Sequence, residues 1–423
     1  MNLKLRNIPF SPPDMTEKEA AEVREAILSG WITTGPRTKK LEALISEYVH
    51  TDKTVCLNSA TAALEMVLHL LDIQPEDEVI VPAYTYTATA SVTQHVGCKL
   101  VMVDSQKDSV EMDYDKLAAA ITEKTKVICP VDLGGIVADY ERVFEIVEAK
   151  KRLFRPSNAL QAKIGRIVVS ADCAHSFGAS QNGKMAGEIA DFSSFSFHAV
   201  KNFTTAEGGA LTWKLPFGNE TVPTDADYML TVPKKEGEMW NELLYRLGQL
   251  FSLHGQNKDA LAKTKLGAWE YDIIGPWYKC NMTDIMAALG LVQFDRYPAI
   301  LQRRYDIVER YNAALKDLPV AVLDHKGADH CGSHHLYIVR LLGKTREETN
   351  KVIEQMAERG IATNVHYKPL PMMTAYKALG FDIANYPNAY HLFENEITLP
   401  LHTKLTDEDV EYVITNFVEI VSK

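Results

Sequence analysis

Short apolar runs alternate with amphipathic helical patterns between residues 54 and 213, and this alternation leaves few folds open to the chain. The runs have the length of strands, and helical patterns separate the first five of them. Alternation of this kind is typical of a mostly parallel sheet with helices on both faces. The predicted strands are Thr54–Leu57, Glu78–Val81, Lys99–Val103, Lys126–Val131, Ile167–Ser170, Asp191–Phe197 and Ala210–Trp213.

An arm of two helices precedes this predicted sheet. Thr16 and Glu19 match a capping box that opens a helix ending near Ser29. A second helix is predicted over Thr38–Val49. Residues 214–275, which follow the sheet, are less regular and richer in charge, and we expect part helix and part loop there.

The pattern changes again in the last third of the chain. A long helical pattern covers residues 283–317 and contains Pro298, a candidate break. A chain of 423 residues is long for one compact unit. We therefore predict a large α/β domain over residues 1–295, which includes the helical arm, and a smaller α+β domain over 296–423. Its predicted elements are a strand at Leu336–Leu341, a helix over Arg346–Arg359, a strand near Ile397–Leu399 and a final helix from Thr406, which Asp409 helps to cap.

Charge and cysteine usage restrict the possible partners and the compartment. The net charge of −11 argues against nucleic-acid or anionic-membrane surfaces as partners. The start, Met1–Pro13, is polar and contains prolines rather than a signal pattern, and no apolar run is long enough for a membrane span. The six cysteines are scattered without a C-x-x-C pair, which favours free thiols. We expect a cytoplasmic protein.

A lysine follows the sixth predicted strand. The segment Ser194–Lys201 ends a strand with Lys201 in the loop just beyond it, and Glu207-Gly208-Gly209 comes next. A lysine that binds the aldehyde of pyridoxal phosphate (PLP) needs such a rigid edge, and burial lowers its pKa so that the neutral amine can attack. Taken alone, a lysine at this position is more often a surface lysine in a loop than a functional one.

An aspartate occupies a similar position after the fifth predicted strand. The run Ser170–Gly178 delivers Asp172 to the edge of the sheet. An aspartate beside the pyridinium nitrogen of PLP keeps that nitrogen protonated, so the cofactor can act as an electron sink. The alternative for Asp172 in isolation is a helix N-cap or a turn at the end of a strand.

Two further strand ends carry residues suited to the same cofactor. After the first strand, Asn58-Ser59-Ala60-Thr61 opens a helix whose free amides could bind a phosphate. Without the other motifs it is simply a good N-cap. After the second strand, Pro82–Thr87 places an aromatic side chain where it could stack on a pyridine ring. Packing in the core is the commoner role for a tyrosine there.

Together these motifs resemble the DegT/StrS-type sugar aminotransferases, which are fold type I PLP enzymes that act on nucleotide-linked keto-sugars. The resemblance covers nearly the whole chain. It implies a mostly parallel seven-stranded sheet flanked by helices, with a smaller α+β C-terminal domain. Further motifs that carry it are Gly30–Pro36, Ser196–Asn202, His366–Leu370 and Leu399–His402.

The resemblance implies a role for each candidate residue of the cofactor site. Lys201 would form the Schiff base with PLP and act as the catalytic residue. Asp172 would pair with the pyridinium nitrogen, His175 would lie against the ring-hydroxyl side, and Tyr86 would stack on the ring. The phosphate would be held by Ser59, Ala60, Thr61 and Ser196.

The resemblance also implies a homodimer with a shared active site. In the family a partner residue completes the phosphate site, and the segment Tyr278–Asp284 matches that piece, with Asn281 as the expected contact. Trp31, His366 and Tyr367 are the expected substrate-binding residues. The chain differs from many members in its extra sequence around Arg155–Arg166, which we predict to be a surface loop.

The implied reaction is a two-step transamination. An amino-acid donor, expected to be L-glutamate, leaves its amino group as pyridoxamine phosphate, and a nucleotide-linked keto-sugar then accepts it. Leu253-His254-Gly255 with Lys258-Asp259-Ala260, and Tyr278–Asp284, look most like the branch that aminates C4, which includes the UDP-4-amino-4-deoxy-L-arabinose aminotransferase. The alternatives are a 3-keto-sugar aminotransferase, a PLP-dependent sugar dehydratase, or a non-catalytic regulator or nucleotide-sugar-binding protein.

Other motifs argue for no further chemistry. The cluster His330–His335 lacks the second ligand pair of a structural zinc site, so we expect no metal. Gly343-Lys344-Thr345 ends like a P-loop, but the first glycine of that motif is missing. The sequence contains no G-x-G-x-x-G, which disfavours a dinucleotide-binding dehydrogenase.

Overall fold

The computed structural model describes residues 5–257 and 270–422, and a seven-stranded sheet forms its centre. Six strands run parallel, and β9 alone is antiparallel to both of its neighbours. The mostly parallel sheet predicted from the alternating pattern is therefore confirmed. In spatial order the strands are β1 (Lys53–Leu57), β9 (Gly209–Trp213), β8 (Phe192–Ser196), β5 (Val168–Asp172), β4 (Thr125–Ile128), β2 (Glu78–Pro82) and β3 (Lys99–Val103).

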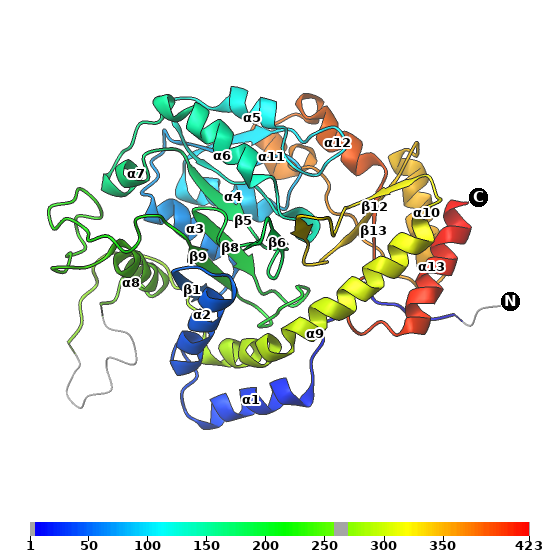
Figure 1. Cartoon of the computed structure of the whole chain (residues 1–423), viewed down its shortest axis with the longest axis horizontal. Coiled ribbons are helices and arrows are strands. Elements are labelled where there is room, and N and C mark those ends of the chain that lie inside the picture. The colour runs from blue at the N-terminus through cyan, green and yellow to red at the C-terminus, as the bar shows by residue number, and fades with distance from the viewer. Residues whose placement is uncertain (1–4, 258–269, 423) are drawn as a thin grey trace.

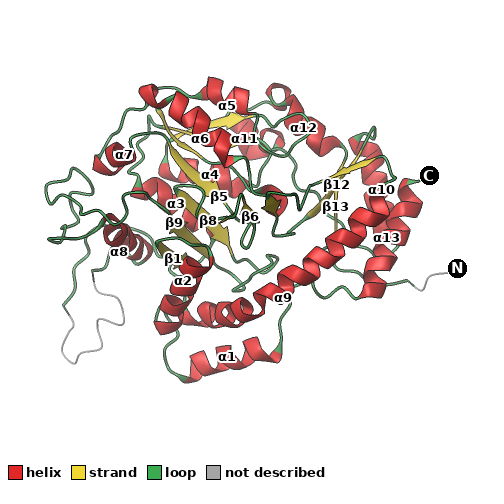
Figure 2. Cartoon of the chain, viewed as in Figure 1, coloured by secondary structure: helices red, strands yellow, loops and turns green. Residues whose placement is uncertain are grey.

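Helices cover both faces of this sheet (Figures 1 and 2). Alternate residues of a strand point to opposite faces. On β2, Val79 and Val81 join one hydrophobic core and Ile80 joins the other. One core includes buried residues of α3 (Ala60–Leu70), α4 (Thr87–Val96) and α8 (Trp240–Ser252), and the other those of α2 (Pro36–Tyr48), α5 (Tyr114–Ala120), α6 (Tyr140–Ala149) and α9 (Asp284–Leu315).

The N-terminal arm forms as predicted and packs on the long helix. Thr16 and Glu19 make a capping box at the start of α1 (Glu17–Leu28). Figure 1 shows α1 beside the first half of α9. Glu19 is buried there and accepts hydrogen bonds from Gln293 at 2.8 Å and Arg296 at 2.6 Å.

The long helix α9 continues through Pro298, so the break considered at that residue is wrong. A proline inside a helix removes one backbone hydrogen bond. Tyr297 and Ile300, on either side of it, are buried in the core, and this packing holds the helix together across the proline. The predicted domain boundary between residues 295 and 296 lies inside α9, and the division into two domains stays a proposal.

The C-terminal part has a sheet and a core of its own. The three antiparallel strands β10 (Val320–Val322), β12 (Tyr337–Leu341) and β13 (Glu396–Leu399) pack with α10 (Arg346–Glu358) and α13 (Asp407–Val421). Thr406 and Asp409 form the predicted capping box of α13. The shorter elements are α11 (Thr374–Ala378), α12 (Pro387–Glu394), β11 (His330–Cys331), β6 (Ser180–Gln181) and β7 (Lys184–Met185).

The extra sequence around residues 155–166 is not a plain surface loop. It contains α7 (Ala159–Ile164), whose N-terminus is capped by Asn158. Leu160 is fully buried and Gln161 donates to the carbonyl of Leu71, so the segment is anchored to the core. The surface loop predicted there is wrong, because a cap and one apolar anchor were enough to order a short helix.

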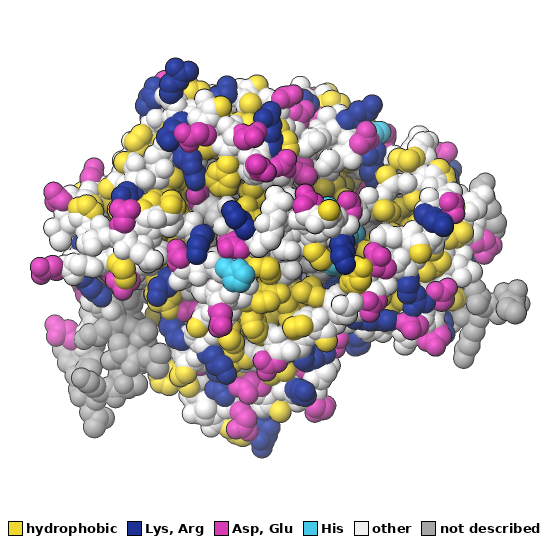
Figure 3. Space-filling model, in the orientation of Figure 1, with side chains coloured by type: hydrophobic (Ala, Val, Ile, Leu, Met, Phe, Trp, Pro, Cys, Tyr) yellow, Lys and Arg dark blue, Asp and Glu magenta, His cyan; other side chains and the backbone are white. Residues whose placement is uncertain are grey.

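The face of the molecule seen in Figure 3 carries side chains of both charge signs together with apolar side chains, some of which adjoin one another near its centre. Across residues 5–257 and 270–422, the structure contains no helix that combines the length and the apolar character of a membrane span.

Candidate active site

The carboxyl ends of β5 and β8, the start of α3 and the C-terminal segment 364–367 line a cavity of about 490 Å³. This position agrees with the rule that ligands of parallel sheets bind beyond the carboxyl ends of the strands. Ten of the residues predicted for the site line this cavity: Ser59, Ala60, Thr61, Tyr86, Asp172, His175, Ser196, Lys201, His366 and Tyr367.

Lys201 lies five residues beyond the end of β8, in a loop whose turn is closed by a bond from its amide to the carbonyl of His198. Burial lowers the pKa of its amine to about 8, and Asp172 partly opposes that shift. An amine with this pKa is partly neutral near pH 7 and can act as a nucleophile. The environment therefore supplies the property that a Schiff-base lysine needs.

Asp172 is the last residue of β5 and is almost fully buried. The hydroxyl of Thr89 donates to one carboxylate oxygen at 2.7 Å, and the amide of Ala174 donates to the other at 3.1 Å. Burial raises the pKa of Asp172, while these bonds and Lys201 oppose the shift. The sequence did not indicate Thr89, because this residue is on α4 and meets Asp172 only in the folded chain.

His175 has a defined proton arrangement. The amide of Gly134 donates to Nδ1 at 3.2 Å, so the proton of the neutral ring is on Nε2 and faces the Tyr367 hydroxyl at 3.2 Å. Burial and the charge of Lys201 lower the pKa of His175 well below its ordinary value, which keeps the ring neutral. Tyr367 was predicted to bind substrate, and in the structure it also contacts this histidine.

A second histidine, His335, lies behind the first with 4.5 Å between ring centroids. Its Nδ1 is 2.9 Å from the side-chain oxygen of Asn202. The side-chain NH₂ group of Asn202 donates to the carbonyl of Ser333 at 2.7 Å. The Lys201 loop is thus tied to the segment that carries His335. Sequence reasoning missed His335, although its neighbour in space, Asn202, directly follows the lysine.

The start of α3 offers free amides to the cavity. The Ser59 hydroxyl caps the helix by accepting from the amide of Ala62 at 3.1 Å, while the amides of Ala60 and Thr61 have no acceptor within their helix. A Cβ at Gly209 would lie 2.4 Å from the nitrogen of Ala60, so only glycine lets β9 come this close to the start of the helix. Ser196, at the end of β8, also lines the cavity.

The two tyrosines after β2 have different surroundings. Tyr84 is buried and donates its hydroxyl to the carbonyl of His366 at 2.8 Å. Tyr86 is 59% exposed, lines the cavity, and has its ring centroid 5.9 Å from that of Tyr367. Tyr84 therefore packs in the core, whereas Tyr86 has an open face available for stacking.

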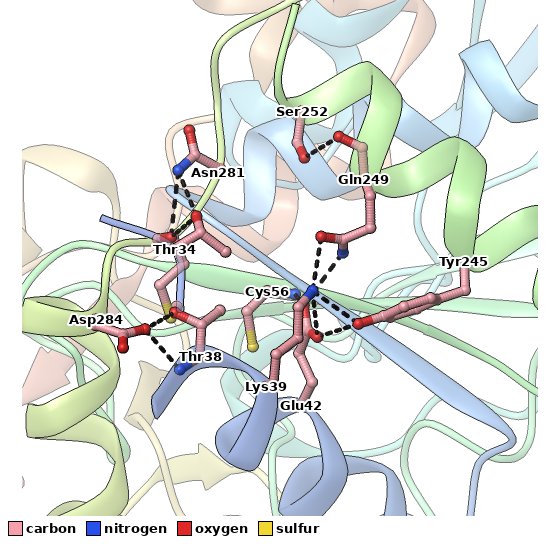
Figure 4. A network of polar contacts seen from close by, with 11 residues as sticks. Thr34, Thr38, Lys39, Glu42, Cys56, Tyr245, Gln249, Ser252, Asn281 and Asp284 are labelled. Carbon is pink, nitrogen blue, oxygen red and sulfur yellow. Dashed lines mark hydrogen bonds and ion pairs between the residues drawn. The ribbon is translucent and has the colours of Figure 1, made fainter. Parts of the chain in front are cut away.

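Two predicted residues, Trp31 and Asn281, lie outside the lining of this cavity. The Trp31 ring donates to the carbonyl of Thr34 at 3.1 Å, and the Asn281 side chain donates to the Thr34 hydroxyl at 2.6 Å. Figure 4 shows Asn281 beside Thr34 in the polar network that also contains Asp284 and Thr38. The predicted contact of Asn281 with a partner's site stays a prediction.

The residues of the cavity fit PLP by their chemistry. An amine of lowered pKa, a buried carboxylate and two free helix amides meet in one space, and they suit its aldehyde, its pyridinium nitrogen and its phosphate respectively. No group of three or more His, Cys, Asp or Glu side chains suited to a metal ion occurs in the part of the chain that the structure describes.

Comparison with known proteins agrees with this geometry. The model of the DegT/DnrJ/EryC1/StrS aminotransferase family matches residues 13–418. Spr1654 of Streptococcus pneumoniae, named as a sugar aminotransferase, is 57% identical in its PMP form, with a TM-score of 0.90 over 98% of this chain and 99% of that one. A PLP form of the same protein is also similar.

More distant relatives extend the likeness. The spore coat polysaccharide biosynthesis protein SpsC of Bacillus subtilis is 32% identical over 98% of this chain and 97% of its own. PseC of Helicobacter pylori, an aminotransferase of pseudoaminic acid biosynthesis, is 25% identical with a TM-score of 0.81, over 99% of this chain and 100% of that one.

Proposed function

We propose that this chain, which belongs to the DegT/DnrJ/EryC1/StrS aminotransferase family and is a PLP-dependent sugar aminotransferase, moves an amino group from L-glutamate to a nucleotide-linked keto-sugar at C4. The observation that carries the proposal is the pairing of Lys201 with Asp172 in one cavity. Burial lowers the pKa of the lysine to about 8 while the buried carboxylate lies near enough to oppose the shift. Both properties are needed for reversible amine transfer.

The positions of the side chains support a role for each of them. PLP, when bound, supplies the carbonyl group that takes up the amino group and the ring that withdraws electrons. Lys201 would hold the aldehyde carbon, and its free amine would move a proton to and from the substrate carbon as a general acid and base. Asp172 would hold a proton on the ring nitrogen. Ser196 and the α3 start, through Ser59 and the amides of Ala60 and Thr61, bind the phosphate.

The neutral histidine pair and the tyrosines complete the cofactor pocket. With its Nε2 proton directed at Tyr367, His175 leaves the Tyr367 hydroxyl proton free for another acceptor in the cavity. Tyr86, with its open face, is proposed to stack on the ring. We further propose a homodimer in which Asn281 of one subunit contacts the phosphate site of the other, and in which Trp31 lies near the substrate.

The choice of a nucleotide sugar and of C4 rests on the resemblance of particular segments. Leu253–Gly255 and Tyr278–Asp284 support the branch that aminates C4, whereas Lys258–Ala260 lie outside the described residues. The names of SpsC and PseC, which link those proteins to polysaccharide and pseudoaminic acid biosynthesis, support a sugar as the acceptor.

Separate half-reactions test this proposal. The PLP form of the purified protein is titrated with L-glutamate, and the loss of PLP absorbance is expected to yield the PMP form. Matched 4-keto and 3-keto nucleotide sugars are then supplied to the PMP form. Return of PLP absorbance with the 4-keto series is the expected result, and turnover of the 3-keto series alone would contradict the C4 assignment.

A further inference from the structure

A chain of buried polar groups lies behind the C-terminal wall of the cavity, away from the sheet that carries Lys201. Glu396 and Thr398 are two residues apart on β13, so their side chains share one face of that strand. Both are fully buried. The segment that holds His366 pairs with β13 through Asn364. The amide of Asn364 donates to the carbonyl of Thr398 at 3.1 Å, and the amide of Thr398 donates to the carbonyl of Asn364 at 2.8 Å.

These residues make a continuous hydrogen-bond relay to His366. Its Nδ1 lies 2.9 Å from the Thr398 hydroxyl, and that hydroxyl donates to Oε1 of Glu396 at 2.5 Å. The backbone amide of His366 donates to Oε2 of the same carboxyl group at 3.0 Å. Tyr84 holds the next peptide group along the chain by donating to the His366 carbonyl. The backbone and the ring of His366 are therefore held independently.

Aromatic contacts fix the plane of the ring. Phe10 stacks on His366 with 5.7 Å between centroids and 21° between planes, and Tyr367 meets it edge-on at 5.0 Å. Phe10 reaches this place because Ile8 bridges to Ile361 at the edge of the C-terminal part. With Nδ1 engaged by Thr398, the ring nitrogen left for a ligand in the cavity is Nε2. Because the His366 ring is already held in place, it loses little side-chain entropy when a ligand binds.

The charge state of His366 restricts what Nε2 can bind. Burial and the nearby Lys201 lower the pKa of His366 to about 3, so the ring is neutral near pH 7. A neutral ring offers at Nε2 one lone pair or one N–H, depending on the tautomer. A hydroxyl group both donates and accepts, so it fits either tautomer, whereas a carboxylate accepts only.

The relay sets that tautomer. Ionised Glu396 can only accept, so it takes the Thr398 proton, and Thr398 then accepts from Nδ1–H of His366. Burial raises the pKa of Glu396 to about 8, against the bonds from Thr398 and the His366 amide. With that pKa, Glu396 is mostly protonated near pH 7. It then donates to Thr398, Thr398 donates to Nδ1, and the proton of the His366 ring lies on Nε2. A hydroxyl ligand remains compatible with both arrangements.

We propose that Glu396 and Thr398 are positioning residues that hold His366 to bind a hydroxyl group of the sugar substrate. The inference rests on the proposed function, because it assigns His366 to the sugar half of that reaction. L-Glutamate carries carboxylates and an amine but no hydroxyl. Its carboxylates fit only the Nε2–H form of His366, whereas a sugar hydroxyl fits both tautomers that the relay can set. The relay therefore favours the sugar substrate.

The two half-reactions separate this role from a structural one. The variants are Thr398→Val, which removes the relay, and Thr398→Ser, which restores a hydroxyl. Thr349→Val is the matched control, because Thr349 is buried in the same part of the molecule and its hydroxyl bonds only its own helix, at the carbonyl of Thr345. The sugar probe is whichever nucleotide amino-sugar of a 3-amino and 4-amino panel the wild-type PLP form converts best.

We expect Thr398→Val to raise the concentration of amino-sugar that gives half-maximal conversion about tenfold, the effect of one lost hydrogen bond at a buried site. The L-glutamate half-reaction and the affinity for PLP should stay within about twofold of wild type, because the proposal assigns the relay to the sugar substrate. Thr398→Ser should recover the sugar half-reaction, and Thr349→Val should match wild type in both.

Equal losses in both half-reactions, or an unchanged sugar half-reaction in Thr398→Val, would overturn the inference. If Thr398→Val does not fold, Glu396→Gln and His366→Gln must show the same selective loss for the inference to stand. Failure of the proposed function gives a different result, because the wild-type protein itself would then convert no amino-sugar of the panel while still binding PLP.

Discussion

The two walls of the cavity differ in how they are built. The sheet wall consists of strand ends and one helix start, and it carries Lys201, Asp172 and the amides of Ala60 and Thr61. The C-terminal wall is an irregular segment, 364–367, held by β13 and by Phe10 from the segment before α1. The sheet wall has the groups for cofactor chemistry, whereas the C-terminal wall has the neutral polar groups suited to recognition. Substitutions in the sheet wall should affect both half-reactions, whereas substitutions in the C-terminal wall should affect only the sugar half-reaction.

The largest effect is expected at the lysine of the sheet wall. Lys201→Ala should lower turnover by about 10⁴-fold, since it removes both the nucleophile and the general acid–base. Steady-state amine transfer from L-glutamate measures the change, and circular dichroism checks the fold. Turnover within tenfold of wild type would show that Lys201 is not the catalytic residue.

The aspartate should come next and should also affect both half-reactions. Asp172→Asn leaves a buried pyridinium without its counter-ion, a loss of about 3 kcal/mol or more, which corresponds to at least a hundredfold in rate. Thr89→Val is the matched control, because it removes one bond to the same carboxylate and keeps the charge. A selective effect of Asp172→Asn on the sugar half-reaction would break the contrast between the two walls.

Cofactor attachment should depend on pH through Lys201. Only the neutral amine attacks the aldehyde, and the pKa of Lys201 is lowered from 10.5 to about 8. The rate at which PLP attaches to cofactor-free protein should therefore increase about tenfold for each unit by which the pH rises toward 8, and it should level off above pH 8. Stopped-flow absorbance gives the profile. A midpoint near 10.5 would mean that the sheet wall leaves the lysine unperturbed.

The smallest effect is expected at the helix start. Ser59→Ala removes the cap of α3, worth about 1 kcal/mol, and should weaken PLP binding about fivefold. Thr345→Ala is the control, since Thr345 caps α10 in the same way but lies outside the cavity lining. It should reduce the melting temperature by a similar amount and leave PLP affinity unchanged. Equal PLP affinities in the two variants would argue against a phosphate at α3.

The contrast between the walls also explains what the sequence could predict. Lys201, Asp172 and Ser59 each follow an apolar run, and strand ends of a parallel sheet share one edge, so local patterns placed them together. His335 and the Thr398–Glu396 pair meet the site through contacts between residues 30 or more positions apart, which no local periodicity encodes. His366 and Tyr367 were expected from the family resemblance alone.

The elements show the same dependence on local signals. The capping boxes of α1 and α13 were predicted from two residues each, because a cap is a local interaction. Pro298 and residues 155–166 misled the sequence reasoning, since burial of Tyr297 and of Leu160 by distant parts of the chain decides the structure there. Tertiary packing overrides local preference at such positions.

Trapping the cofactor tests the central assignment most directly. Borohydride reduction of the yellow, PLP-loaded protein fixes the cofactor to its lysine, and peptide mass spectrometry locates it. The account predicts the added mass of reduced PLP on the peptide that contains Lys201 and none there in Lys201→Ala. Label on a different lysine, or a colourless protein that cannot be reconstituted with PLP, would contradict it.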